Sequence, residues 1–177
     1  MTLIVSSLSD MPEVIVRRRP SHLVSLLDPV VMIETPPGFD PAHHLRIGVG
    51  DISEPVEGLV MADATMIERL IVFGGEWDGR APMLLHCQAG ISRSTAAAFT
   101  LACARNPHFP EAVIARALRR AAPHAYPNRR IVALSDELLG RRGRMIGAIE
   151  AIGANDLTSL AAPFDLPARY GQMAGGA

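Results

Sequence analysis

The most informative absence in this sequence of 177 residues is lysine, because all 17 basic residues are arginine. Schiff-base chemistry, Walker-type nucleotide binding and lysine general bases are therefore excluded. Arginine stays charged in proteins and can hold an oxyanion through two parallel hydrogen bonds. A fixed positive side-chain charge at any binding site of this chain must therefore come from arginine.

Cysteine, net charge and long apolar runs are also scarce. The two cysteines, Cys87 and Cys103, are too few for a disulfide framework or a thiolate zinc site. The net charge of −1 gives no basic excess to attract nucleic acid, and no apolar run approaches the ~18 residues of a membrane span. The N-terminus shows no recognisable leader. We therefore expect no nucleic-acid or membrane partner, a cytoplasmic location and free thiols.

The composition is that of a folded protein. With 49% hydrophobic and 20% charged residues, the chain can bury a core. Its length matches one domain of ordinary size. We predict a single domain over residues 1–177, with a C-terminal tail that frays from about residue 165.

The order of the predicted elements indicates an α/β domain. Apolar runs predict strands at about 3–6, 22–27, 44–49 and 83–85. Apolar periodicity and capping residues predict helices at about 10–18, 56–74, 93–105, 110–123, 128–140 and 142–152. Strands that alternate with helices and then give way to a run of helices are typical of a small sheet flanked by helices, with a helical C-terminal half.

The segment LLHCQAGISRST, residues 84–95, carries the candidate chemistry. A predicted strand leads into His86 and Cys87, and a helix begins at Arg93, six residues after the cysteine. A chain that turns tightly from a strand into a helix points backbone N–H groups at a common centre, where the helix dipole also favours an anion. Gly90 allows the tight turn, and Arg93 adds a planar fork that matches two phosphoryl oxygens. The sequence thus places Cys87, in surroundings that favour a thiolate, beneath an oxyanion site.

The run His86-Cys87-Gln88-Ala89-Gly90-Ile91-Ser92-Arg93-Ser94 resembles the HCxxGxxR[ST] signature of the protein tyrosine phosphatase superfamily. The small chain is similar to the dual-specificity branch and its compact bacterial relatives. Tyr126-Pro127-Asn128 also resembles a Pro-Asn turn that opens a late helix in that branch. The resemblance covers about residues 23–139 and implies a phosphatase-type fold with a small, mostly parallel central sheet.

The resemblance implies a two-step hydrolysis of phosphate monoesters. Cys87 attacks phosphorus and forms a phosphocysteine, while Arg93 and the loop N–H groups hold the equatorial oxygens. Ser94 donates a hydrogen bond to the sulfur that leaves in the second step, and His86 supports the loop. The implied phosphate-binding residues are Gln88, Ala89, Gly90, Ile91, Ser92 and Arg93.

The same mechanism needs a general acid for the leaving oxygen, which then serves as the base for water. In this superfamily the acid is an aspartate on a loop some thirty to forty residues before the cysteine. We assign this role to Asp51, which follows a predicted strand and starts a loop. Asp63 is the rival, although it falls within a predicted helix. The tryptophan typical of this loop is absent, and weaker candidates for the acid are Glu54 and Glu57.

The expected substrate is a phosphorylated protein or a small phosphomonoester, chiefly phosphotyrosine, with phosphoserine and phosphothreonine left open. Free phosphate or sulfate is expected to occupy the same site. Uncharged loop residues and the lack of lysine argue against highly phosphorylated inositols. Phe39 either flanks a phosphotyrosine ring or packs in the protein. No cofactor is implied, and His43-His44 has no further ligand at a metal-binding spacing.

Two other functions compete with the phosphatase. A non-catalytic phosphate-binding module, or pseudophosphatase, would share the loop, but every expected catalytic group is present. A rhodanese-like sulfurtransferase also places a cysteine on a loop before a helix, but the His86-Cys87 start and Ser94 count against it.

Two further features have ordinary interpretations. Cys103 is expected to be a core residue, since a redox partner of Cys87 would have to lie close to it. Arginine is also frequent in the second half of the chain, either on solvated helix faces or as a docking surface for an acidic partner. These residues are Arg116, Arg119, Arg120, Arg129, Arg130, Arg141, Arg142 and Arg144.

Overall fold

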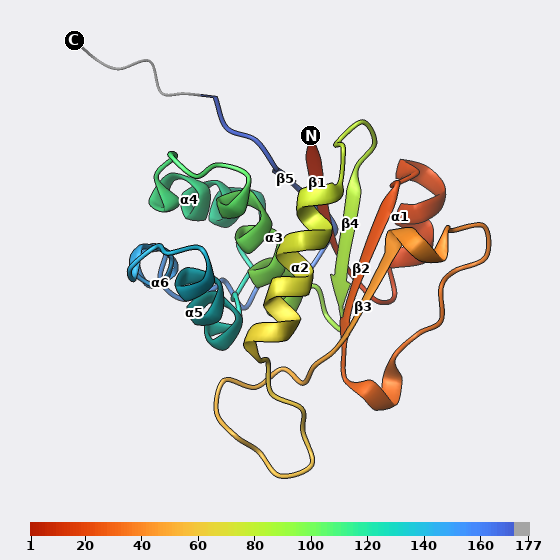
Figure 1. Ribbon diagram of the computed structural model, residues 1–177, viewed down its shortest axis with the longest axis horizontal. Helices are drawn as coiled ribbons and strands as arrows, with labels where there is room; N and C mark the ends of the chain where they lie inside the picture. The colour runs from red at the N-terminus through yellow and green to blue at the C-terminus, as the bar shows by residue number, and fades with distance from the viewer. Residues whose placement is uncertain (172–177) are drawn as a thin grey trace.

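The central sheet has five strands in the order β3-β2-β4-β1-β5 within residues 1–171, the part of the chain that the computed structural model describes (Figure 1). Strands β1 to β4 are parallel where they pair, whereas β5 runs antiparallel beside β1. The prediction of a mostly parallel sheet is therefore confirmed. The strands are β1 (Thr2–Ser7), β2 (His22–Leu27), β3 (His44–Gly48), β4 (Met83–Cys87) and β5 (Phe164–Pro167).

Helices flank the sheet and form the C-terminal half, which confirms the predicted α/β class (Figure 1). Within residues 1–171, none of them is both long and apolar enough to cross a lipid bilayer. Two single turns of 3₁₀ helix, Pro29–Val31 and Pro41–His43, lie in loops. The α-helices are α1 (Met11–Arg18), α2 (Ala64–Glu76), α3 (Arg93–Ala104), α4 (Glu111–Ala121), α5 (Arg129–Leu138) and α6 (Arg144–Ala151).

Alternate side chains of the strands build two apolar cores. In β4, Leu84 joins a small core with Met11 and Val14 of α1. Met83 and Leu85 join the larger core, which contains residues of the remaining helices. Successive side chains of a strand point to opposite faces, so helices cover both sides of β4. This double burial explains why β4 appears in the sequence as an apolar run without alternation.

The helix predicted at 56–74 begins later than expected. α2 starts at Ala64, because the side chain of Asp63 accepts a hydrogen bond from the Met66 N–H at 2.8 Å and caps the helix. Gly58 lies upstream in the left-handed region, at φ +78°, where a helix cannot continue. The apolar spacing that predicted the earlier start therefore runs on from a loop into a true helix.

The prediction that the chain frays from about residue 165 is wrong, because β5 occupies this segment. Phe164 and Leu166 are buried, and the strand pairs with β1. Asp165 accepts a hydrogen bond from Arg18 at 2.8 Å on the exposed side. A four-residue strand that follows Pro163 and ends at Pro167 is too short for a strand pattern to emerge from the sequence. The final MAGGA lies outside the described residues.

The topology places one loop at the centre of the molecule. β4 lies between β1 and β2 in the sheet and leads directly into the loop of residues 88–92 and then into α3. Open α/β sheets bind ligands at the carboxyl ends of their parallel strands. The loop that carries the candidate chemistry therefore lies where this fold class places its sites.

Candidate active site

The loop of residues 88–92, here called the phosphate loop, packs closely against the end of β1. Gly90 has φ +72°, and a Cβ added there would lie 2.8 Å from the carbonyl carbon of Ser6 and 2.9 Å from the nitrogen of Ser7. Both the backbone conformation and the space require glycine. The Leu8 N–H also donates to the Gln88 carbonyl at 3.2 Å. The turn from strand to helix is thus held rigidly on its neighbouring strand.

Cys87 and Ser94 meet beneath the phosphate loop. The Cys87 Sγ lies 3.2 Å from the Ser94 Oγ, within hydrogen-bond distance. Cys87 ends β4 with 1% of its surface exposed, and Ser94, in the first turn of α3, is fully buried. The first N–H groups of a helix have no intrahelical acceptor and attract an anion. The thiol therefore lies beside the N–H groups that begin α3.

Arg93 is held so that part of its guanidinium remains unpaired. The residue is 7% exposed, and its Nη1 donates to the Val49 carbonyl at 2.9 Å. Its Nε is buried without a hydrogen-bond partner within residues 1–171, and it lies 3.9 Å from the Asp51 Oδ2. A buried N–H without an acceptor is costly unless a ligand satisfies it. Within residues 1–171, Arg105, Arg119 and Arg141 also have a buried Nε without a partner. The position of Arg93 beside the phosphate loop therefore makes its donor a candidate for binding an anion.

The structure brings Asp51 to the phosphate loop. Its Oδ1 accepts hydrogen bonds from the Ser92 Oγ at 2.6 Å and from the Asn128 Nδ2 at 2.9 Å. The same Asn128 side chain caps α5 by accepting from the Ile131 N–H at 3.1 Å. One amide thus connects the loop of Asp51 to the start of a helix. The sequence identifies Asn128 as a helix cap, but its bond to Asp51, 77 residues away, is a tertiary contact.

The other carboxylates proposed from the sequence lie elsewhere. Asp63 is the N-cap of α2, and its Oδ1 accepts from the Met66 N–H. Glu54 and Glu57 are exposed on the loop between β3 and α2. Of these four carboxylates, Asp51 contacts both Ser92 and Arg93 within residues 1–171.

A buried chain of hydrogen bonds extends from His86 to the far side of β2. The Ser25 Oγ lies 2.6 Å from the His86 Nε2 and 2.8 Å from the His44 Nε2. The His44 Nδ1 in turn lies 3.0 Å from the Thr35 Oγ1. One hydroxyl proton serves only one of two imidazoles, so one ring donates to Ser25 and the other accepts from it. The chain thereby couples the tautomers of the two rings.

The imidazole rings of His44 and His86 are both neutral at pH 7. Burial lowers the pKa of His86 to about 4, and the Cys87 backbone and His44 have smaller effects. Burial also lowers the pKa of His44 to about 4, with a smaller contribution from Arg46. His86 therefore acts beside Cys87 as a neutral hydrogen-bonding group.

These shifts predict acid destabilisation between pH 6.5 and 4. An unfolded histidine titrates near pH 6.5, so the unfolded chain binds more protons than the folded one in this window. The free energy of unfolding should fall as the pH falls, by at most about 1.4 kcal/mol per pH unit for each ring. Urea unfolding at pH 7, 6 and 5 measures this slope.

His44→Asn should reduce the slope of the unfolding free energy against pH by the contribution of one histidine, at most about 1.4 kcal/mol per pH unit. His108→Asn, at an exposed position between α3 and α4, is the matched control and should leave it unchanged. Equal slopes for the wild type and His44→Asn would show that His44 is not held neutral by the fold.

A hollow of about 600 Å³ opens beside the phosphate loop. Its lining includes Asp51, Ser92, Tyr126, Pro127 and Arg129. The Tyr126 N–H donates to the Ile91 carbonyl at 2.8 Å, so this part of the lining is bonded directly to the phosphate loop. The hollow has room for a group attached to a bound phosphate.

Three other residues considered from the sequence lie away from this geometry. Cys103 is fully buried in α3, and burial raises the pKa of its thiol, as a core residue requires. Phe39 packs against the small core on the α1 side of the sheet. Arg141 is neither solvated nor free to dock a partner, since it is buried and donates to the Glu111 carboxylate at 3.1 Å and to the Cys103 carbonyl at 2.7 Å.

Residues 1–171 contain no group of three or more side chains arranged to hold a metal ion.

Solved structures that share this fold are phosphatases, although no protein-family model and no curated protein matches the sequence. The PTP-2 phosphatase of Cydia pomonella is 19% identical, with a TM-score of 0.58 over 76% of this chain and 84% of that one. Human DUSP28 is 17% identical, with a TM-score of 0.57 over 79% and 92%. DUSP15 is 20% identical, with a TM-score of 0.53 over 85% and 89%. The chain thus shares the fold of these dual-specificity and protein tyrosine phosphatases.

Proposed function

We propose that this chain is a cysteine-dependent phosphatase that hydrolyses phosphate monoesters on proteins, chiefly phosphotyrosine. The observation that carries the proposal is the arrangement at the phosphate loop. The Cys87 thiol lies against Ser94 below the loop, while the buried Nε of Arg93 has no hydrogen-bond partner within residues 1–171. A tetrahedral dianion supplies the acceptor that Arg93 lacks and presents phosphorus to a thiolate. The shared fold supports this assignment.

In the first step, the Cys87 thiolate forms a bond to phosphorus as the bond from phosphorus to the leaving oxygen breaks. Arg93 and the loop N–H groups bind the three equatorial oxygens, on which charge is concentrated in the transition state. Asp51, beside Ser92 at the edge of the loop, transfers its proton to the leaving oxygen. The products are a phosphocysteine and an alcohol or phenol.

In the second step, water attacks the phosphocysteine and loses its proton to Asp51, now a carboxylate. The bond between phosphorus and sulfur breaks, and inorganic phosphate leaves. The Ser94 Oγ, 3.2 Å from the Cys87 Sγ, donates to the sulfur as it regains negative charge. The phosphate loop thus serves both steps with one set of donors.

Hydrolysis of a small aryl phosphate by the purified protein at pH 5 to 7 tests the proposed activity. Turnover that saturates with substrate and is inhibited by inorganic phosphate is expected. Phosphate binding without turnover at any of these pH values would identify a pseudophosphatase and reject the enzyme. Production of thiocyanate from thiosulfate and cyanide would indicate a sulfurtransferase.

Asp51→Asn should lower kcat by about 10²–10⁴-fold with a tyrosyl or alkyl phosphate, the usual size of general acid catalysis. The loss should shrink with an aryl ester whose leaving group has a low pKa, because that oxygen departs without a proton. Measuring kcat across a series of leaving groups therefore separates acid catalysis from simple damage to the site.

Asp63→Asn is the matched control and also tests the rival acid. Asparagine caps helices as well as aspartate does, so the folding of α2 should be retained. An unchanged rate for Asp51→Asn with a tyrosyl ester, or a leaving-group-dependent loss for Asp63→Asn, would contradict the assignment of Asp51.

A further inference from the structure

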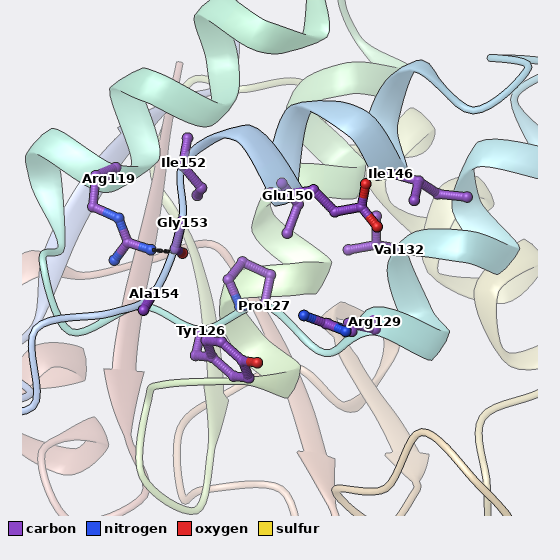
Figure 2. Close-up of a pocket in the computed structure, with 11 residues that line it drawn as sticks. Arg119, Tyr126, Pro127, Arg129, Val132, Ile146, Glu150, Ile152, Gly153 and Ala154 are labelled. Carbon is purple, nitrogen blue, oxygen red and sulfur yellow. Dashed lines mark hydrogen bonds between the residues drawn. The ribbon is translucent and has the colours of Figure 1, made fainter.

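A second cavity of about 260 Å³ lies beside the candidate active site (Figure 2). Figure 2 shows Tyr126 and Pro127 along one side of it, and Ile146 and Glu150 of α6 on the other. Val132 of α5 lies near these side chains. The cavity thus falls between the last two helices and the segment that borders the phosphate loop, and the proposed chemistry does not use it.

The cavity adjoins the hollow next to Asp51. Tyr126, Pro127 and Arg129 line both spaces, so these three residues form a wall between them. The Tyr126 N–H donates to the Ile91 carbonyl and the Asn128 N–H to the Ser92 carbonyl, which ties the wall to the phosphate loop. A group in the cavity and a phosphate in the loop are therefore neighbours on a rigid frame.

The lining of the cavity selects apolar groups. Its interior is formed by aliphatic side chains, with Arg129 and Glu150 exposed at the rim. Arg119 is not available to a ligand, because its guanidinium donates to the carbonyls of Pro123, Ala125 and Gly153. The aliphatic residues are Val132, Ile146, Ile149 and Ile152.

The size of the cavity and its position beside the hollow indicate a peptide side chain. Pockets for drug-sized ligands span about 300–1,000 Å³, so this smaller cavity suits a single aliphatic or aromatic side chain. Tyr126, Pro127 and Arg129 border both spaces. A peptide that places its phosphorylated side chain in the phosphate loop therefore places a neighbouring side chain at the cavity.

We propose that the cavity binds an apolar side chain adjacent to the phosphorylated residue of a peptide substrate. Arg129 at the rim donates hydrogen bonds to a backbone carbonyl or a carboxylate of the same peptide. This inference rests on the proposed phosphatase function and adds to it the class of sequence that the enzyme selects.

The test compares phosphotyrosine peptides that differ at the flanking positions. Peptides with leucine or phenylalanine there should exceed aspartate-substituted ones in kcat/KM by about 10–200-fold, as expected for an apolar pocket. Ile146→Arg, which places a charge in the cavity, should remove this preference. It should leave hydrolysis of p-nitrophenyl phosphate within about twofold, because that substrate contacts only the phosphate loop and the hollow.

Leu138→Arg is the matched control for this variant. Leu138 is 36% exposed and does not line the cavity, whereas Ile146 is 37% exposed and does. Leu138→Arg should keep the preference for apolar peptides. Retention of that preference in Ile146→Arg, or equal losses on peptides and p-nitrophenyl phosphate, would overturn the inference while the phosphatase function stands.

Binding measurements separate this inference from the failure of the proposed function. In the Cys87→Ser background, Ile146→Arg should weaken binding of a leucine-flanked phosphopeptide by about tenfold and leave binding of inorganic phosphate unchanged. This result would support the cavity even if the wild type showed no turnover. A preference for phosphorylated lipid in vesicles over every peptide, lost in Ile146→Arg, would assign the cavity to lipid and overturn the peptide proposal.

Discussion

Cys87→Ser should abolish turnover of phosphate monoesters, with a loss of kcat on the order of 10⁴–10⁶-fold. Loss of the nucleophile from a covalent mechanism costs up to about 10⁶-fold in kcat. A serine hydroxyl ionises far less readily than a thiol, and the Ser94 hydroxyl beside it is not a base. The Arg93 guanidinium and the loop N–H groups remain, so binding of inorganic phosphate should be retained. Steady-state hydrolysis and calorimetric phosphate titration measure the two effects.

Cys103→Ala is the matched control, because Cys103 is the other cysteine and is fully buried in the core. Its removal should leave kcat within about twofold and lower only the stability. If Cys87→Ser retained substantial turnover, phosphocysteine chemistry would be excluded. If Cys103→Ala were as inactive as Cys87→Ser, the interpretation of Cys103 as a structural residue would fail.

Arg93→Lys should lower kcat/KM by roughly 10³–10⁵-fold, the range attributed to an arginine that stabilises phosphoryl transfer. Lysine keeps the charge but loses the planar pair of donors that matches two phosphoryl oxygens. The hydrogen bond to the Val49 carbonyl also depends on the guanidinium. Both kcat/KM and the affinity for inorganic phosphate should fall, whereas Cys87→Ser should affect turnover alone.

Arg130→Lys provides the comparison at a nearby arginine. Arg130 follows the Asn128 cap and donates from its Nε to the Ala62 carbonyl at 3.3 Å, outside the phosphate loop. Its substitution should leave kcat/KM within about twofold. Unfolding midpoints of both variants show whether the chain remains folded. A folded Arg93→Lys variant with near-normal activity would contradict the role of Arg93.

Several parts of the proposed site follow from local sequence patterns. An apolar run before His86, Gly90 within the turn and Arg93 at a helix start suffice to predict an anion-binding loop. The Asn128 cap was predicted by the same kind of local argument and is confirmed. Each pattern depends on backbone conformations within a few residues, which neighbouring side chains determine.

Other parts could not be predicted in this way. The start of α2 was misplaced because apolar residues of the preceding loop happened to follow a helical spacing, and β5 was missed because four residues carry too little pattern. Local sequence does not distinguish the buried Arg141 from a surface arginine, because its partners, Glu111 and the Cys103 carbonyl, are tertiary contacts.

The amino-acid sequence alone was therefore sufficient for the class of fold, the candidate phosphate loop and the candidate nucleophile, since these depend on local properties of a strand, a turn and a helix. The absence of lysine already implied that any fixed positive side-chain charge at an anion site comes from arginine. Other features are visible only in the folded structure. They are the order of the strands, the hydrogen bond from Asn128 to Asp51, the hydrogen-bonded series of Ser25, His44 and His86, and the second cavity. They join segments up to 77 residues apart, and the packing of the whole chain, rather than sequence spacing, determines which segments meet.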